Sequence, residues 1–122
     1  MKLITRSVFA LLFVLALAAS SRAQNPNIAV KLDAHKNCVR IELKNLTTAT
    51  IGVSYIELWV YDGKTCKRIC ATRKVINKKI KACDTLKELE LCCSDLPNAS
   101  EYIYYVRIHH SAGINEAWAF AP

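Results

Sequence analysis

The densest group of chemically active side chains in this sequence is a run of cations between residues 64 and 83. The run contains no carboxylate, because Asp62 and Asp84 stand just outside it. Its eight basic residues are Lys64, Lys67, Arg68, Arg73, Lys74, Lys78, Lys79 and Lys81. Clustered positive charge attracts a partner of opposite sign through a force that salt screens. The run is therefore the predicted binding surface.

Residues 1–23 have the composition of a secretory signal peptide. A positively charged start is followed by an apolar run over residues 8–19 and by a small-residue cleavage site that ends at Ala23. The apolar run is shorter than the roughly 20 residues that span a bilayer. We therefore expect a secreted, soluble mature chain, residues 24–122, that folds as one domain.

The charge of the expected mature chain is polarised. It has 14 basic and 10 acidic residues, which gives a net charge of +4. The cationic run contributes +8, so the rest of the mature chain sums to −4. In an extracellular protein, such a run predicts contact with an acidic protein, a sulfated glycan or an anionic membrane surface. Nucleic acid is not an expected partner of a secreted chain.

Six cysteines form the second reactive set. They are Cys38, Cys66, Cys70, Cys83, Cys92 and Cys93. An even number of cysteines in a small exported chain is typical of a disulfide framework, and we expect three disulfide bonds. The spacings are not those of zinc fingers, so neither a metal site nor a cofactor is expected. Two glycosylation sequons, at Asn45 and Asn98, fit the same extracellular setting.

The side chains that serve catalysis are not arranged for a common mechanism. His109 and His110 are adjacent on an expected strand, so their rings diverge, and His35 lies in an expected turn. Neither a G-x-S-x-G nor an H-E-x-x-H motif nor a phosphate-binding loop occurs. With every cysteine expected in a disulfide, no thiolate nucleophile remains. The prediction is a protein that is not an enzyme.

Alternating apolar and polar residues predict the elements that position these side chains. The pattern is clearest where Val39, Ile41 and Leu43 share one face. We expect strands at 27–34, 38–46, 53–61, 85–93, 101–110 and 115–120. Short strands separated by turns favour an antiparallel sandwich. The face of 53–61 that carries Tyr55 and Trp59 either floors a site or packs beneath a covering segment.

The cationic run itself fits two structures. At 100° per residue, its cysteines and isoleucines fall on one arc and most of its cations on the opposite arc, as in an amphipathic helix. Its β-branched residues, which include Thr72, Val75 and Ile76, lower helix propensity. The prediction is left open between a short amphipathic helix within 65–82 and a short edge strand with a basic loop.

The end of the chain has a distinctive spacing of five residues. They are Leu96, Ser100, Tyr102, Val106 and Gly113. This spacing resembles the last hairpin of a fibronectin type III module, and the resemblance implies a small antiparallel immunoglobulin-like sandwich. In that topology the strand that begins at Cys38 is an antiparallel neighbour of the strand that ends at Cys93. Cys38 is therefore expected to bond to Cys92 or Cys93.

The remaining cysteine of the adjacent pair is expected to bond to one of the three cysteines in the cationic run. Adjacent residues of a strand point to opposite faces, so Cys92 and Cys93 need different partners. Each bond of this kind contributes about 2–4 kcal/mol. That is a large share of the roughly 5–15 kcal/mol by which a domain is stable.

The loop at 62–70 leaves two further hypotheses open. Its Asp62-Gly63 turn and its two cysteines, Cys66 and Cys70, are similar to the paired-cysteine loop of ML-type lipid-recognition sandwiches. That resemblance implies a secreted lipid carrier with an apolar cavity between its sheets. The same loop presents Lys67 and Arg68 between cysteines, as disulfide-clamped inhibitors of trypsin-like serine proteases do.

These observations predict a mainly β, small, antiparallel immunoglobulin- or fibronectin type III-like sandwich with three disulfides. We expect a secreted, monomeric binding or effector glycoprotein, such as a toxin of the venom or host-interaction type. Its contact surface is the cationic run. A lipid carrier and a serine protease inhibitor are the alternatives.

Overall fold

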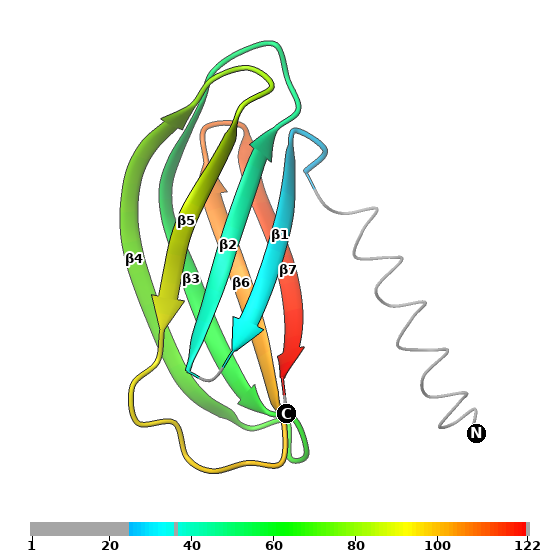
Figure 1. The fold of residues 1–122 in the computed structure, drawn as a ribbon, viewed down its shortest axis with the longest axis vertical. Coiled ribbons are helices and arrows are strands. Elements are labelled where there is room, and N and C mark those ends of the chain that lie inside the picture. The colour runs from blue at the N-terminus through cyan, green and yellow to red at the C-terminus, as the bar shows by residue number, and fades with distance from the viewer. Residues whose placement is uncertain (1–24, 36, 122) are drawn as a thin grey trace, which may run out of the picture.

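The computed structural model describes residues 25–35 and 37–121, which form two antiparallel sheets packed face to face (Figure 1). The strands are β1 (Ile28–His35), β2 (Cys38–Asn45), β3 (Ile51–Asp62), β4 (Arg68–Ile80), β5 (Thr85–Cys92), β6 (Tyr102–His110) and β7 (Gly113–Ala121). One sheet has the order β1-β2-β5 and the other the order β4-β3-β6-β7. The predicted antiparallel sandwich is therefore confirmed, and it is compatible with the immunoglobulin-like class. The expected signal peptide lies outside the described residues.

The core lies between the sheets and follows the alternation seen in the sequence. Val39 and Leu43 of β2 face Leu58 of β3 and Val106 of β6, and all four side chains are fully buried. Each of the six strands expected from the pattern coincides with an observed strand. Burial of alternate apolar residues is the main force that fixes which face of each strand points inward.

The prediction of a short amphipathic helix within 65–82 is wrong, because Arg68–Ile80 form the edge strand β4. The strand pairs with β3 along its length, from Ile51 opposite Ile80 to Tyr61 opposite Arg68. A bulge interrupts the pairing, and Asn77 within it has a positive φ of 49°. The inward positions of β4 are still every second residue, from Cys70 opposite the buried Val60 to Ile80 opposite the buried Ile51, but Thr72, Lys74 and Lys78 occupy three of them. The apolar residues that remain therefore do not recur with a period of two, and their spacing resembles that of a helix. No helix of the described residues is long and apolar enough to cross a membrane.

The expectation of three disulfides is also wrong, because the structure forms two. Cys38 bonds to Cys92 and Cys70 bonds to Cys93, as the predicted topology required. Cys66 precedes β4 and Cys83 follows it, and both thiols are free and exposed.

The length of β4 explains the two free thiols. The strand has 13 residues, and at about 3.3 Å per residue its ends lie roughly 40 Å apart. A disulfide needs Cα atoms within about 7 Å of each other. Cys66 and Cys83 therefore cannot bond to each other within one chain.

The connection that leads into β6 is fixed by a tyrosine. Tyr102 Oη donates a hydrogen bond of 2.8 Å to the backbone oxygen of Pro97, and Leu96 packs against the core. Leu96 and Tyr102 belong to the spacing that resembles a fibronectin type III hairpin. The bond ties the irregular segment after β5 to the first residue of β6, which is how immunoglobulin-like sandwiches hold this corner.

Candidate functional site: a basic edge and an aromatic sheet face

The eight predicted cations lie on β4 and on the turns at its two ends. All eight side chains are exposed. None of them forms an ion pair with another residue in 25–35 or 37–121. We call this set of eight residues the basic edge, because β4 is an outer strand of its sheet (Figure 1). The structure thus brings every predicted cation to one margin of the sandwich.

The first cations of the basic edge are held by the Asp62-Gly63 turn. The Asp62 carboxylate accepts hydrogen bonds from the backbone N–H groups of Lys64, at 2.7 Å, and Thr65, at 3.2 Å. The backbone N–H of Asp62 donates to the oxygen of Lys67 at 2.9 Å. A Cβ atom at Gly63 would collide with the side chain of Glu101, so any other residue there would have to displace that side chain. The turn therefore fixes the backbone that carries Lys64 and Lys67.

Further along β4, two cations lie on opposite sides of the strand. The Arg73 guanidinium lies 4.3 Å from the centre of the Tyr55 ring on the outer side of the sheet. The Lys74 ammonium donates to the backbone oxygen of Glu90 on β5, at 3.4 Å. Because successive residues of a strand alternate, the positive charge extends over both sides of the margin.

Three aromatic rings form a row across the outer side of the β4-β3-β6-β7 sheet. The Trp59 and Tyr105 ring centres are 5.1 Å apart, and those of Tyr105 and Trp118 are 4.4 Å apart. No segment of residues 25–35 or 37–121 covers the row, and Trp118 is 42% exposed. We call this side of the sheet the aromatic face. The sequence left open whether the face with Tyr55 and Trp59 floors a site or packs beneath a covering segment. Within the described residues, no segment covers it.

Polar groups form a connected network beside the aromatic row. Tyr105 Oη donates to Glu116 Oε2 at 2.6 Å, and Arg107 Nε lies 3.7 Å from the same oxygen. Glu57 Oε1 and His109 Nε2 are 2.8 Å apart. Burial, followed by the hydrogen bond to Glu116, raises the pKa of Tyr105 well above its ordinary value. The phenol is therefore a fixed donor at neutral pH.

The sequence alone did not reveal this network. Alternation placed Glu57 and Trp59 on one face of their strand, and Trp118 and Phe120 on one face of theirs. It did not show that β6 lies between those strands and completes the row with Tyr105. The strand order of an immunoglobulin-like sandwich is the signal that joins these segments.

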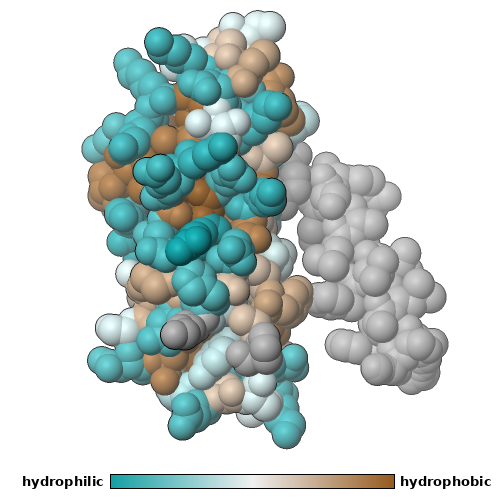
Figure 2. All heavy atoms as spheres, viewed as in Figure 1, coloured by the Kyte–Doolittle hydropathy of each residue, from teal (hydrophilic) through white to brown (hydrophobic). Residues whose placement is uncertain are grey.

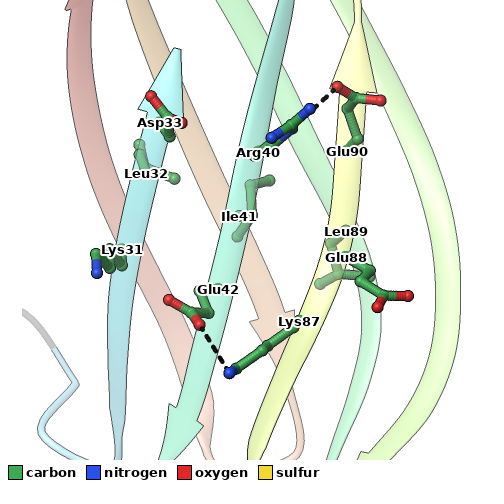
Figure 3. A pocket seen from close by; sticks show the side chains of 10 residues that line it. All are labelled: Lys31, Leu32, Asp33, Arg40, Ile41, Glu42, Lys87, Glu88, Leu89 and Glu90. Atoms are coloured by element: carbon green, nitrogen blue, oxygen red, sulfur yellow. Dashed lines mark ion pairs between the residues drawn. The ribbon is translucent and has the colours of Figure 1, made fainter.

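The outer side of the β1-β2-β5 sheet has a different character. Figure 2 views this side and shows mostly hydrophilic residues. An open hollow of about 560 Å³ lies there, and two ion pairs cross it, Arg40–Glu90 at 3.7 Å and Lys87–Glu42 at 3.9 Å (Figure 3). Both signs of charge line the hollow, so it offers no strong field to a charged ligand. It is also not the apolar cavity between sheets that a lipid carrier needs.

The remaining histidines and cysteines do not assemble a reactive centre among the described residues. His109 lies on the aromatic face, whereas the buried His110 contacts Asn115 Oδ1 at 2.8 Å. The two rings diverge as predicted. Burial lowers the pKa of His110. The sulfurs of Cys38 and Cys92 lie near Glu90, but their disulfide leaves no thiolate for a metal.

The two predicted sequons have different surroundings. The Asn45 side chain is fully buried, and its Nδ2 donates to the backbone oxygens of Ala49, at 2.7 Å, and Ile80, at 2.8 Å. A glycan on this nitrogen would displace both bonds. Asn98 is exposed in the segment between β5 and β6. Glycosylation stays a prediction, and the geometry favours Asn98.

The loop proposed for a protease inhibitor lacks its expected clamp. Cys70 bonds to Cys93 and Cys66 is free, so no disulfide closes the loop around Lys67 and Arg68. Inhibition of a serine protease stays a prediction, and no disulfide clamp supports it.

Comparisons with known proteins do not assign the chain to a family. No protein-family model matches the sequence, and no curated protein matches it significantly.

Proposed function

We propose that the chain is a secreted, non-enzymatic binding protein whose basic edge contacts an acidic extracellular partner. The observation that carries the proposal is the exposure of all eight cations along one margin, with no ion pair to the rest of the described chain. Charges that are not paired internally remain available to a ligand. The two disulfides support an oxidising, extracellular setting.

Among acidic partners, the shape of the basic edge favours a flexible polyanion such as a sulfated glycan. The cations follow a strand of 13 residues rather than a flat patch. An extended ligand can follow this line and meet side chains from both of its sides, whereas a flat membrane meets mainly one side. The outer edge of β4 also leaves backbone N–H groups without strand partners, and these donate readily to anions.

The resemblance to a fibronectin type III module is part of the same proposal. The strand order supports it, and so does the hydrogen bond from Tyr102 to Pro97. Modules of this shape position a binding surface without a catalytic centre. The basic edge is then a surface carried by a rigid sandwich.

Retention on immobilised heparin, a sulfated polyanion, tests the proposal. We expect the variant Lys74→Glu/Lys78→Glu/Lys79→Glu to elute at much lower salt than the native chain, because it replaces attraction with repulsion along β4. The matched control is Lys31→Glu/Lys44→Glu/Lys87→Glu, which makes the same change in net charge on exposed positions of the other sheet. The control should lose much less retention. Equal losses in the two variants would show that total charge governs binding and would refute a specific basic edge.

A further inference from the structure

The aromatic face has the composition of a protein interface. Four large apolar side chains on it are strongly exposed: Val75 at 60%, Phe120 at 51%, Trp118 at 42% and Ile114 at 41%. The strands β3, β6 and β7 contain no lysine, and they carry tryptophan, tyrosine and arginine instead. Enrichment in aromatic residues and arginine with depletion of lysine distinguishes interface centres from ordinary surface. Exposed apolar side chains gathered on one side of a sheet are typical of an interaction site.

A row of four charged residues crosses the aromatic face and shows what fits it. The strand registers place Arg73 opposite Glu57, Glu57 opposite Arg107, and Arg107 opposite Glu116. From β4 to β7 the charges therefore run positive, negative, positive, negative. Such a row is complementary to itself when its order is reversed.

A two-fold axis parallel to the strands performs this reversal. It stacks β4 over β7 of a second copy and β3 over β6 of that copy. Arg73 then faces Glu116 of the partner subunit, and Glu57 faces Arg107 of the partner subunit. An axis perpendicular to the strands would instead place each charge over its own copy, which is repulsive. The row thus selects one orientation.

The neighbouring rows fit the same orientation. The register places Ala71 opposite Trp59, Trp59 opposite Tyr105, and Tyr105 opposite Trp118. Reversal puts the exposed Trp118 over Ala71 of the partner subunit, which is the smallest side chain of that row. It also puts Val75 over Ile114 of the partner subunit. A large residue meets a small one, and the exposed aliphatic residues meet each other.

We propose that the aromatic face is the interface of a symmetric dimer, in which two copies pack sheet against sheet with their strands aligned. This departs from the monomer expected from the sequence, and it does not rest on the proposed polyanion binding. The face has four strands, two of them nine residues long. It therefore measures roughly 20 by 30 Å, or about 600 Å², which is the lower end of the area per partner in a standard interface. The dimer takes Arg73 of each basic edge into the interface, and it leaves Lys74 and Lys78, on the other side of β4, open to a ligand on opposite margins.

Sedimentation velocity of the native mature chain, from about 1 to 100 µM, tests the dimer over a range of ordinary interface affinities. We expect the mass to rise to that of two chains. Glu57→Arg alone and Arg107→Glu alone should each weaken association by at least about tenfold, because each brings like charges together twice per dimer. An equimolar mixture of the two variants should associate again. In that mixture Arg at position 57 meets Glu at position 107, and the other contact regains opposite charges as well.

The mixture separates a failed interface from a failed fold. A variant that does not fold cannot be rescued by mixing, and circular dichroism of each variant alone verifies its strands. Arg40→Glu and Glu42→Arg on the other sheet are the matched controls, and they should dimerise like the native chain. Both tryptophans of the chain lie on the aromatic face, so their emission should shift to the blue as the dimer forms. A native chain that stays monomeric at about 100 µM, or a mixture that stays monomeric, would overturn the proposal.

Discussion

The outer sides of the two sheets are built by the same alternation, yet they carry different kinds of side chain. On the β1-β2-β5 side, charged residues of both signs line an open hollow, and two glutamates form ion pairs across it, one with an arginine and one with a lysine (Figures 2 and 3). On the β4-β3-β6-β7 side, aromatic rings stack across three strands and the charged residues lie among them. The β1-β2-β5 side has the side chains of a solvated surface, whereas the aromatic face has those of a protein interface.

The difference shows that burial in the core constrains only half of each strand. The inward residues of β2 in one sheet and of β3 and β6 in the other are apolar and buried. The outward residues are free to specialise, and on the aromatic face they form a second, smaller packed layer around Tyr105, which is 8% exposed. Solvent-facing residues with no function would not be expected to exclude water in this way. The comparison predicts that substitutions on the two outer sides have unequal consequences.

The largest effect is expected for Tyr105→Ala on the aromatic face. The substitution removes the ring that contacts both Trp59 and Trp118, and it removes the hydrogen bond to Glu116. We expect a loss of about 3–5 kcal/mol in the free energy of unfolding. Urea denaturation at protein concentrations low enough to keep the chain monomeric measures it.

The matched control for this prediction lies at an outward position of the other sheet. Arg40→Ala removes a side chain that is 65% exposed and should change stability by no more than about 0.5 kcal/mol. If Tyr105→Ala and Arg40→Ala gave similar small losses, the aromatic layer would contribute no packing energy, and the contrast between the two sides would fail.

A smaller effect is expected at alkaline pH. Burial raises the pKa of both Tyr104 and Tyr105 above the ordinary value of 10.0, and Glu116 raises the pKa of Tyr105 further. The folded chain thus keeps protons that the unfolded chain releases above pH 10. The stability that these phenols contribute is complete below pH 10 and is lost as the pH rises above that value.

Tyr105→Phe isolates the contribution of the second phenol. It should be less stable than the native chain at neutral pH by about 1 kcal/mol, because a hydrogen bond to a carboxylate is lost. Its unfolding free energy should then fall less steeply above pH 10. Ultraviolet absorbance of tyrosinate in the native chain should show two of the five tyrosines ionising late. An equally steep decline in both proteins would contradict the raised pKa of Tyr105.

Much of the fold could be predicted because alternation depends on adjacent residues only. The six expected strands and the bonds of Cys92 and Cys93 to different partners all follow from a period of two. The structure of β4 could not be predicted in the same way. Polar residues such as Lys74 and Lys78 occupy inward positions of this edge strand, so its apolar residues do not alternate and resemble a helical stripe.

To predict the free cysteines and the charged row, one would need the distances between segments that lie far apart in the sequence. Counting cysteines assumes that each has a partner within reach, and the length of β4 separates Cys66 from Cys83. The row of charges depends on the registers of three strand pairs, which single-residue slips would destroy. The role of the eight cations as a binding surface stays a prediction, and their position on one edge came from the fold.

The smallest expected effect compares two ion pairs of identical length. Arg40–Glu90 and Arg107–Glu116 both join Nε to Oε2 at 3.7 Å, one on each outer side. The side chain of Arg40 is 65% exposed and that of Arg107 is 31% exposed, so water screens the first pair more strongly. Double-mutant cycles to alanine should give coupling energies of about 0–0.3 kcal/mol for the first pair and about 0.5–1 kcal/mol for the second. Salt should weaken the first coupling further and leave most of the second. If the two couplings were equal at every salt concentration, the aromatic face would be as wet as the opposite side, and its claim to be a contact surface would lose its physical basis.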